Sequence, residues 1–278
     1  MLILALDTST HQASIALCSE DVLYGEYIWR VNNNHSVEML QEIQHLLKNC
    51  DLTLAHVDAI AVATGPGSFN GVRVALATAK TLAYILKKPL VGISTLECMA
   101  FQQRQWRGLV CAVQEAGRSE LYAACYAFDE QRNEQGEVVY AMHQCSDYLL
   151  LPPQEIAGVV QEKVSVWTEV AQERQALPAL FAGELISLSR QRLRESLQAQ
   201  CVFEEQNQTA RRASALALIA LQRLREGKED DPLLLEPLYL RRPSITTSTR
   251  KQALLGGVEQ RQVTEQNKPE REEGALRH

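Results

Sequence analysis

The spacing of hydrophobic positions over the first 93 residues predicts strands and helices that alternate after an initial run of three strands. Short apolar or alternating stretches predict five strands, at residues 2–7, 13–18, 22–29, 57–64 and 90–93. Apolar residues at helical spacing predict two helices, at residues 36–49 and 72–86. The fourth strand is almost continuously apolar, as expected for a strand that is covered on both faces.

The order of these elements predicts a ribonuclease-H-like α/β lobe over residues 1–107. Three further strands, at 109–113, 121–128 and 137–143, begin a second lobe at 108–242 and suggest an internal duplication. Pro152-Pro153 predicts a break, and a mixture of short elements follows up to residue 205. A helix is predicted at 213–225. Residues 243–278 lack hydrophobic periodicity and are predicted to be a disordered tail.

The helix predicted at 36–49 has two apolar stripes, although one stripe is enough to cover a sheet. Val37, Leu40 and Leu47 are assigned to the sheet, and the second stripe contains Met39, Ile43 and Leu46. A neighbouring helix of the same chain or a partner protein could cover that second stripe. We expect the partner, and therefore expect these three side chains to be exposed. In the helix at 72–86, Ala75 and Ala79 share one side and permit close packing.

Composition and charge exclude several classes of protein. The chain has 278 residues, of which 46% are hydrophobic and 22% charged, so it is neither mainly disordered nor a coiled-coil rod. The net charge of −6 argues against nucleic-acid binding by this chain alone, but not against membership of a complex that binds RNA. No apolar run is long enough for a membrane span, and the N-terminus lacks the basic start of a signal peptide. Seven cysteines without a C-x-x-C pair predict reduced thiols in a cytoplasmic protein.

Two segments could contact phosphate. Asp7, Thr8 and Ser9 follow the first strand, where a carboxylate could orient a magnesium-bound water and hydroxyl groups could meet a phosphate. A simple turn is the alternative explanation. Gly65, Gly67 and Ser68 begin a glycine-rich turn before the second helix, which lets backbone amides approach either a ligand or another loop. No Gly-Lys-Ser/Thr follows, so the turn is not a P-loop.

Together these motifs resemble one family. Five stretches are similar to TsaB proteins: Asp-Thr-Ser at 7–9, Gly-Pro-Gly-Ser-Phe-Asn-Gly-Val-Arg at 65–73, the strand at 89–96, Glu-Leu-Tyr at 120–122 and Pro-Leu-Tyr-Leu-Arg at 237–241. These are partner subunits of the bacterial tRNA threonylcarbamoyladenosine machinery. The resemblance implies the two-lobed, actin-like ASKHA fold. It also implies two partners, the paralogue TsaD and the ATPase TsaE. It further implies that the chain forms a homodimer when alone, contacts tRNA only through the complex and does not associate with a membrane.

The resemblance also implies which residues meet the partner and which functions have been lost. The two helices would pack against the like pair of TsaD through His35, Met39, Ile43, Leu46, Ala75 and Ala79. Thr95 and Met99 stand where TsaD has its metal-binding histidines, so no metal site and no catalytic residue are expected. No other two histidines are spaced to replace them.

The second phosphate loop of the family departs from its pattern as well. The stretch Glu115–Tyr122 has Gly117 where the family has an arginine. Asp7, Thr8, Ser9, Gly65, Gly67 and Ser68 are therefore interpreted as vestigial phosphate loops, with no required cofactor and weak ATP or ADP binding left open. The favoured function is a non-catalytic scaffold subunit. The alternative is an independent ATP-dependent kinase or ATPase of the same fold, and a metallopeptidase ranks last because paired metal ligands are missing.

Overall fold

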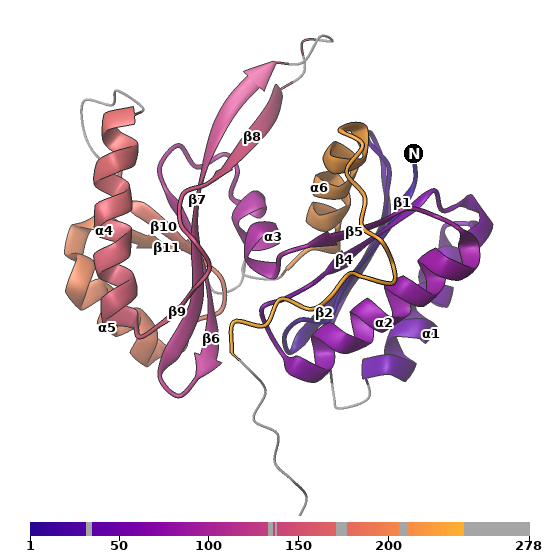
Figure 1. The fold of residues 1–278 in the computed structure, drawn as a ribbon, viewed down its shortest axis with the longest axis horizontal. Helices are drawn as coiled ribbons and strands as arrows, with labels where there is room; N and C mark the ends of the chain where they lie inside the picture. The colour runs from indigo at the N-terminus through magenta and orange to yellow at the C-terminus, as the bar shows by residue number, and fades with distance from the viewer. Residues whose placement is uncertain (32–34, 133–135, 137, 171–176, 206–210, 242–278) are drawn as a thin grey trace, which may run out of the picture. The chain divides into compact units, whose positions relative to one another are not determined.

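Two mixed sheets with the same strand order dominate the structure, a computed structural model that describes residues 1–31, 35–132, 136, 138–170, 177–205 and 211–241 (Figure 1). The first sheet has the order β3-β2-β1-β4-β5. β1, β2 and β3 are antiparallel neighbours, whereas β4 is parallel to both β1 and β5. The five strands are β1 (Ile3–Asp7), β2 (Gln12–Cys18), β3 (Leu23–Arg30), β4 (Ala59–Ala63) and β5 (Leu90–Ile93).

The second sheet repeats this arrangement in the order β8-β7-β6-β10-β11, with three antiparallel strands followed by two parallel ones. A short additional strand, β9 (Leu149–Leu151), pairs with β7. This repeated topology confirms the predicted internal duplication and the two-lobed ASKHA fold class. The other strands are β6 (Val110–Gly117), β7 (Glu120–Arg132), β8 (Val138–Gln144), β10 (Ala179–Ala182) and β11 (Cys201–Phe203).

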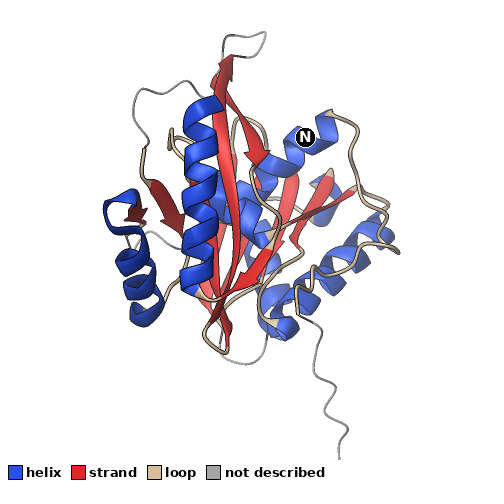
Figure 2. Ribbon diagram, turned by 60° about the vertical axis from the view of Figure 1, so that its left-hand side comes forward, coloured by secondary structure: helices blue, strands red, loops and turns tan. Residues whose placement is uncertain are grey.

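Helices cover both faces of each sheet and create three hydrophobic clusters (Figures 1 and 2). α1 and α2 cover the outer face of the first sheet, and α4 and α5 cover the outer face of the second. α3 and α6 lie in the central layer between the sheets. The helices are α1 (His35–Asn49), α2 (Phe69–Leu86), α3 (Thr95–Gln102), α4 (Pro153–Val170), α5 (Ser187–Leu197) and α6 (Ala213–Arg225), with short 3₁₀ turns at Leu54–His56 and Gln198–Gln200.

The stripe of α1 that was expected to be exposed is buried. Met39, Ile43 and Leu46 are at most 3% exposed and pack in the cluster beneath α1 and α2, whereas Leu40 is 51% exposed. The prediction is therefore wrong for these three residues, because their stripe faces the sheet. Of the residues assigned to the sheet, Leu47 is buried in this cluster as expected, whereas Leu40 is not. Burying each side chain contributes roughly 1.5–3 kcal/mol. The side chains of His35 and Val37 lie outside the described residues.

Ala75 and Ala79 of α2 are also fully buried in this cluster. Their small side chains allow close packing inside the lobe, so the expectation that they contact a partner is corrected too. Ser68 caps α2 by accepting a hydrogen bond from the Gly71 amide, at 3.3 Å. The helix consequently begins at Phe69, within the glycine-rich turn, and not at Val72 as predicted.

The boundary predicted for the second lobe is wrong at its C-terminal end. α6 packs on β1, β2, β4 and β5 of the first sheet, although it follows the whole second sheet in the chain. The backbone beyond it returns to the same lobe, where Asp230 bridges to Leu90 and the Leu238 amide donates to the Thr64 carbonyl at 2.8 Å. Residues 211–241 therefore complete the first lobe. The predicted tail at 243–278 lies outside the described residues.

Candidate functional site

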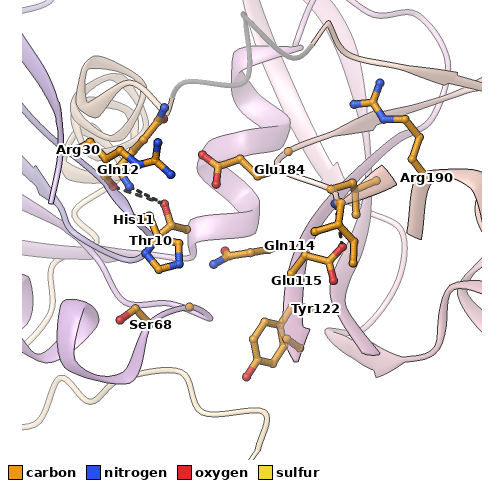
Figure 3. A pocket seen from close by; sticks show the side chains of 15 residues that line it. Thr10, His11, Gln12, Arg30, Ser68, Gln114, Glu115, Tyr122, Glu184 and Arg190 are labelled. Carbon is orange, nitrogen blue, oxygen red and sulfur yellow. Dashed lines mark hydrogen bonds between the residues drawn. The ribbon is translucent and has the colours of Figure 1, made fainter. Parts of the chain in front are cut away.

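A cleft of about 820 Å³ lies between the two lobes (Figure 3). One wall is formed by the turn after β1 together with the glycine-rich turn before α2, and the other by the end of β6 and the loop after β10. Figure 3 shows Gln114, Glu115, Tyr122 and Glu184 across the cleft from His11 and Ser68. The lining residues are Thr10, His11, Gln12, Arg30, Gly67, Ser68, Gln114, Glu115, Ala116, Tyr122, Gly183, Glu184, Leu185, Ile186 and Arg190.

Asp7 lies beneath this cleft in a buried ion pair. Its side chain is 1% exposed, and its Oδ2 accepts a hydrogen bond from Arg211 Nε at 3.0 Å. Its Oδ1 accepts from both the Ser9 amide at 2.7 Å and the Ser9 hydroxyl at 2.6 Å. Both carboxylate oxygens are therefore used inside the protein. Of the two roles considered for Asp7, a phosphate loop and a structural turn, these internal contacts favour the structural one.

Arg211 holds the floor of the cleft together from 204 residues away in the sequence. Its Nη2 donates to the Thr10 hydroxyl and, at 2.9 Å, to the Gln12 carbonyl, so one guanidinium joins the end of β1 to the start of β2. The side chain is only 3% exposed. Sequence analysis did not identify this residue, because a single arginine before a helix carries no local signal of a buried partner.

The glycine-rich turn packs against the loop that follows β1. A Cβ atom on Gly67 would lie 2.1 Å from the Ser9 carbonyl oxygen, and one on Gly71 would lie 1.9 Å from that of Thr8. The Thr8 hydroxyl donates to the Gly71 carbonyl at 2.6 Å. These glycines thus permit two backbones to approach each other. Of the predicted phosphate-loop residues, Gly67 and Ser68 line the cleft, whereas Thr8 and Ser9 are fully buried.

The motif at residues 237–241, here called the closing segment, meets the glycine-rich motif and also reaches the second lobe. Gly65 has a φ of +97°, and a Cβ there would lie 3.2 Å from the Leu238 carbonyl oxygen. Arg73 Nε donates to the Tyr239 hydroxyl at 2.9 Å. At the other end, Arg241 donates to the Ala116 carbonyl at 3.0 Å and forms an ion pair with Glu120 in the β6–β7 hairpin. Two motifs far apart in the sequence thereby form one structural unit.

Glu204 is a largely buried acid behind the cleft. Its Oε1 accepts from Gln103 Nε2 at 2.7 Å, and its Oε2 accepts from the Gly183 amide at 3.2 Å. Burial raises the pKa of Glu204 to about 7, against the hydrogen bond from Gly183 and the charge of Arg190, which lower it. Glu204 links α3, β11 and the loop that lines the cleft, and its charge changes near neutral pH.

We expect Glu204 to make folding sensitive to pH. Because its pKa is higher in the folded protein than the ordinary value of 4.5, the folded state binds this proton more tightly. This contribution to stability is fully present below about pH 4.5 and is lost as the pH rises through 7. Glu204→Gln should therefore lose less stability than the wild type between pH 5 and 8, as measured by urea unfolding. Parallel pH profiles of the two proteins would contradict this assignment.

In the described part of the chain, no three histidine, cysteine, aspartate or glutamate side chains are grouped as a metal site. Thr95 and Met99 are 0% and 4% exposed, and Met99 belongs to the central hydrophobic cluster. No described helix is both long enough and apolar enough to cross a membrane.

Comparison with known proteins identifies the family. The family model described as TsaD, tRNA N6-adenosine threonylcarbamoyltransferase, matches residues 30–249. The chain is 32% identical to the tRNA threonylcarbamoyladenosine biosynthesis protein TsaB of Bacillus subtilis over 87% of this chain and 94% of that protein. It is 30% identical to TsaB of Escherichia coli, over 87% and 95% respectively. YeaZ from Pseudomonas aeruginosa has a similar structure, with a TM-score of 0.64, 27% identity and coverage of 86% of this chain and 99% of that one. The chain belongs to the TsaB (YeaZ) family, within the group of proteins that the TsaD model describes.

Proposed function

We propose that this chain is the non-catalytic partner subunit of a cytoplasmic complex that transfers a threonylcarbamoyl group to an adenosine of tRNA. The main supporting observation is the Asp7–Arg211 ion pair beneath the cleft. Here a guanidinium and a serine bind both oxygens, and the guanidinium already supplies the counter-charge that a metal–nucleotide complex would provide. The relatives' names, which refer to tRNA threonylcarbamoyladenosine biosynthesis, supply the reaction.

The alternative, an independent kinase or ATPase, has less support. The glycine-rich turn leaves little room for phosphate, because Gly67 and Gly71 pack against the carbonyl groups of Ser9 and Thr8. These carbonyl groups are hydrogen-bond acceptors and would repel a phosphate oxygen. In the second lobe, Glu115 accepts a hydrogen bond from the Ile186 amide at 3.1 Å and so serves the loop beside it. These contacts favour the scaffold function over the kinase or ATPase.

The partner in this proposal is a TsaD-type threonylcarbamoyltransferase, bound by the outer surface of α1 and α2. The family model that matches this chain is described as a threonylcarbamoyltransferase, and the resemblance implies that such an enzyme has a like pair of helices. Large apolar side chains are exposed on both helices here: Leu40 on α1 at 51%, and Tyr84 and Ile85 on α2 at 69% and 68%. Exposed apolar surface of this kind favours a protein interface. In isolation, the same surface would join two copies of this chain.

Reconstitution tests the proposal. Purified chain, TsaD, the ATPase TsaE, threonylcarbamoyl-adenylate and tRNA are mixed, and the modified adenosine is measured by mass spectrometry of digested tRNA. We expect no modification and no significant ATP hydrolysis by the chain alone, and modification by the complete mixture. If omission of this chain leaves the rate unchanged, or if the chain alone modifies tRNA, the scaffold function is wrong.

Ile85→Glu should abolish binding to TsaD without unfolding this chain. A glutamate at an apolar interface leaves a buried charge unpaired, which costs several kcal/mol, and each 1.4 kcal/mol weakens binding tenfold. We therefore expect at least about a hundredfold rise in the Kd by calorimetry. Ile43→Glu is the matched control, because Ile43 is 3% exposed and this variant should unfold. Leu40→Glu should fold normally. Normal TsaD binding by folded Ile85→Glu would place the interface elsewhere.

A further inference from the structure

Three cysteines lie in a row across three neighbouring strands of the second sheet, away from the cleft. Cys111 of β6 is directly opposite Cys125 of β7 in the antiparallel register. On the other side of Cys125, the amide of Cys145 donates to its carbonyl at 2.8 Å, just after β8 ends. All three side chains belong to the hydrophobic layer between the sheet and α4. The three thiols therefore occupy one face of the sheet, with Cys125 in the middle.

The spacing suits disulfide formation. Opposed residues of antiparallel strands have Cα atoms about 4.5–5.5 Å apart, and disulfides span about 4.4–6.8 Å. The thiol of Cys111 hydrogen-bonds to the sulfur of Cys125, which lowers the pKa of Cys125 and raises that of Cys111. Burial opposes this by raising the pKa of Cys125, while the hydroxyl of Ser146 and the charge of Lys163 lower it further, so the pKa is lowered on balance. The central sulfur thus has surroundings that favour its thiolate, the form that attacks an oxidised partner.

Of the three cysteines, Cys145 is the accessible one in the described structure. Cys111 and Cys125 are 0% exposed, whereas Cys145 is half-buried and lines a surface hollow of about 580 Å³ together with Ser146 and Lys163. Regular pairing also ends here, because the Cys125 amide donates to the Ser146 hydroxyl at 2.9 Å. The backbone around Cys145 is therefore less constrained than the middle of the sheet. A small oxidant in the hollow would meet Cys145 first.

We propose that Cys145 and Cys125 form an oxidation site that a hydroperoxide converts into a disulfide. The Cys145 thiolate attacks the O–O bond of hydrogen peroxide, which gives a sulfenic acid and, after proton transfer, one water. The Cys125 thiolate then attacks the Cys145 sulfur and expels hydroxide, which takes up the proton lost by Cys125 and leaves as the second water. Two thiols are oxidised and one peroxide is reduced. Cys111 lies beside Cys125, and its thiolate can attack the Cys125 sulfur of the new disulfide. This exchange gives a Cys111–Cys125 disulfide and releases the Cys145 thiolate.

Peptide mapping tests the site on the full chain. Reduced protein is treated with hydrogen peroxide, unreacted thiols are alkylated, and non-reduced digests are analysed by mass spectrometry. Cys50 and Cys201 are internal controls, because both are half-buried but neither is opposed by a thiol: Cys50 contacts the Tyr24 carbonyl, and Cys201 pairs with Ala179. We expect a Cys125–Cys145 or Cys111–Cys125 disulfide, whereas Cys50 and Cys201, which have no opposed thiol, should form no disulfide within the chain. Burial raises the pKa of Cys145 to about 11, so its thiolate fraction and the rate should rise about tenfold per pH unit from pH 7 to 9.

Two variants make the result decisive. Cys145→Ser should abolish both disulfides, and Cys111→Ala should retain the Cys125–Cys145 disulfide alone; circular dichroism checks that each variant folds. If either variant is unfolded, a time course on the wild type is used in its place to give the order in which the three cysteines are modified. The proposal is overturned if Cys50 and Cys201 oxidise while no disulfide forms in this row. It is also overturned if Cys111–Cys125 forms equally fast in Cys145→Ser.

Discussion

Replacement of Arg211 with methionine is expected to destabilise the protein by about 3–5 kcal/mol, because it leaves the carboxylate of Asp7 buried without a counter-charge. Asp7 is 1% exposed and cannot reach water without disruption of the turn after β1. The hydrogen bonds from Arg211 to Thr10 and to the Gln12 carbonyl would be lost at the same time. The free energy of unfolding in urea measures the effect.

The neighbouring arginine provides a matched control. Arg212 forms a long contact of 3.9 Å with Glu26, and its side chain is 63% exposed. Arg212→Met should therefore change stability by less than about 1 kcal/mol. The double variant Asp7→Asn/Arg211→Met should recover part of the loss, because no buried charge remains. If Arg211→Met and Arg212→Met have similar stabilities, the ion pair does not hold the floor of the cleft together.

Gly71→Ala is expected to destabilise the protein by about 1–3 kcal/mol or more, the range for overpacking at a close contact. The new methyl group would lie 1.9 Å from the Thr8 carbonyl oxygen, so the backbones of the two loops must separate. Separation would also weaken the 2.6 Å hydrogen bond from the Thr8 hydroxyl to the Gly71 carbonyl. Thermal and urea unfolding would show the loss.

Gly158→Ala is the corresponding control. Gly158 lies inside α4, and a Cβ atom there would meet no atom within 4 Å. Because alanine favours the helix over glycine by about 0.5–1 kcal/mol, this variant should be more stable than the wild type. A loss of stability in Gly71→Ala no larger than the change in Gly158→Ala would show that the contact between the loops relaxes easily.

The elements of the first lobe could be predicted because local sequence patterns determine them. Alternation and apolar runs located β1 to β5, and the turn residues separated them correctly. The face of α1 could not be predicted in the same way, since two stripes of similar hydrophobicity offer two orientations. The sheet selected Met39, Ile43 and Leu46 and left Leu40 exposed. α4 was missed because Pro153 was interpreted as a break, although proline is well suited to the first position of a helix.

The buried contacts of the site depend on pairs that lie far apart in the sequence. Asp7 was identified as a candidate, but its partner Arg211 is 204 residues away, and nothing local distinguishes it from Arg212. The Glu97–Arg223 pair, 126 residues apart, was not anticipated either. The glycine-rich motif was recognised through the family resemblance, and two possible roles were left open for it. The structure supports the approach of another loop, because a Cβ on Gly67 or Gly71 would overlap that loop's carbonyl groups.

The first lobe is assembled from both ends of the described chain, and this affects the order in which the lobes can fold during synthesis. The strands of the first sheet leave the ribosome early, but α6 and the closing segment, which complete it, are made roughly a hundred residues later, on the order of ten seconds at ordinary translation rates. During that interval the inner apolar face of the first sheet lacks its helix. The second sheet, with α4 and α5, is contained within one continuous stretch and can fold first. The nascent chain is therefore most exposed to aggregation just before α6 and the closing segment emerge.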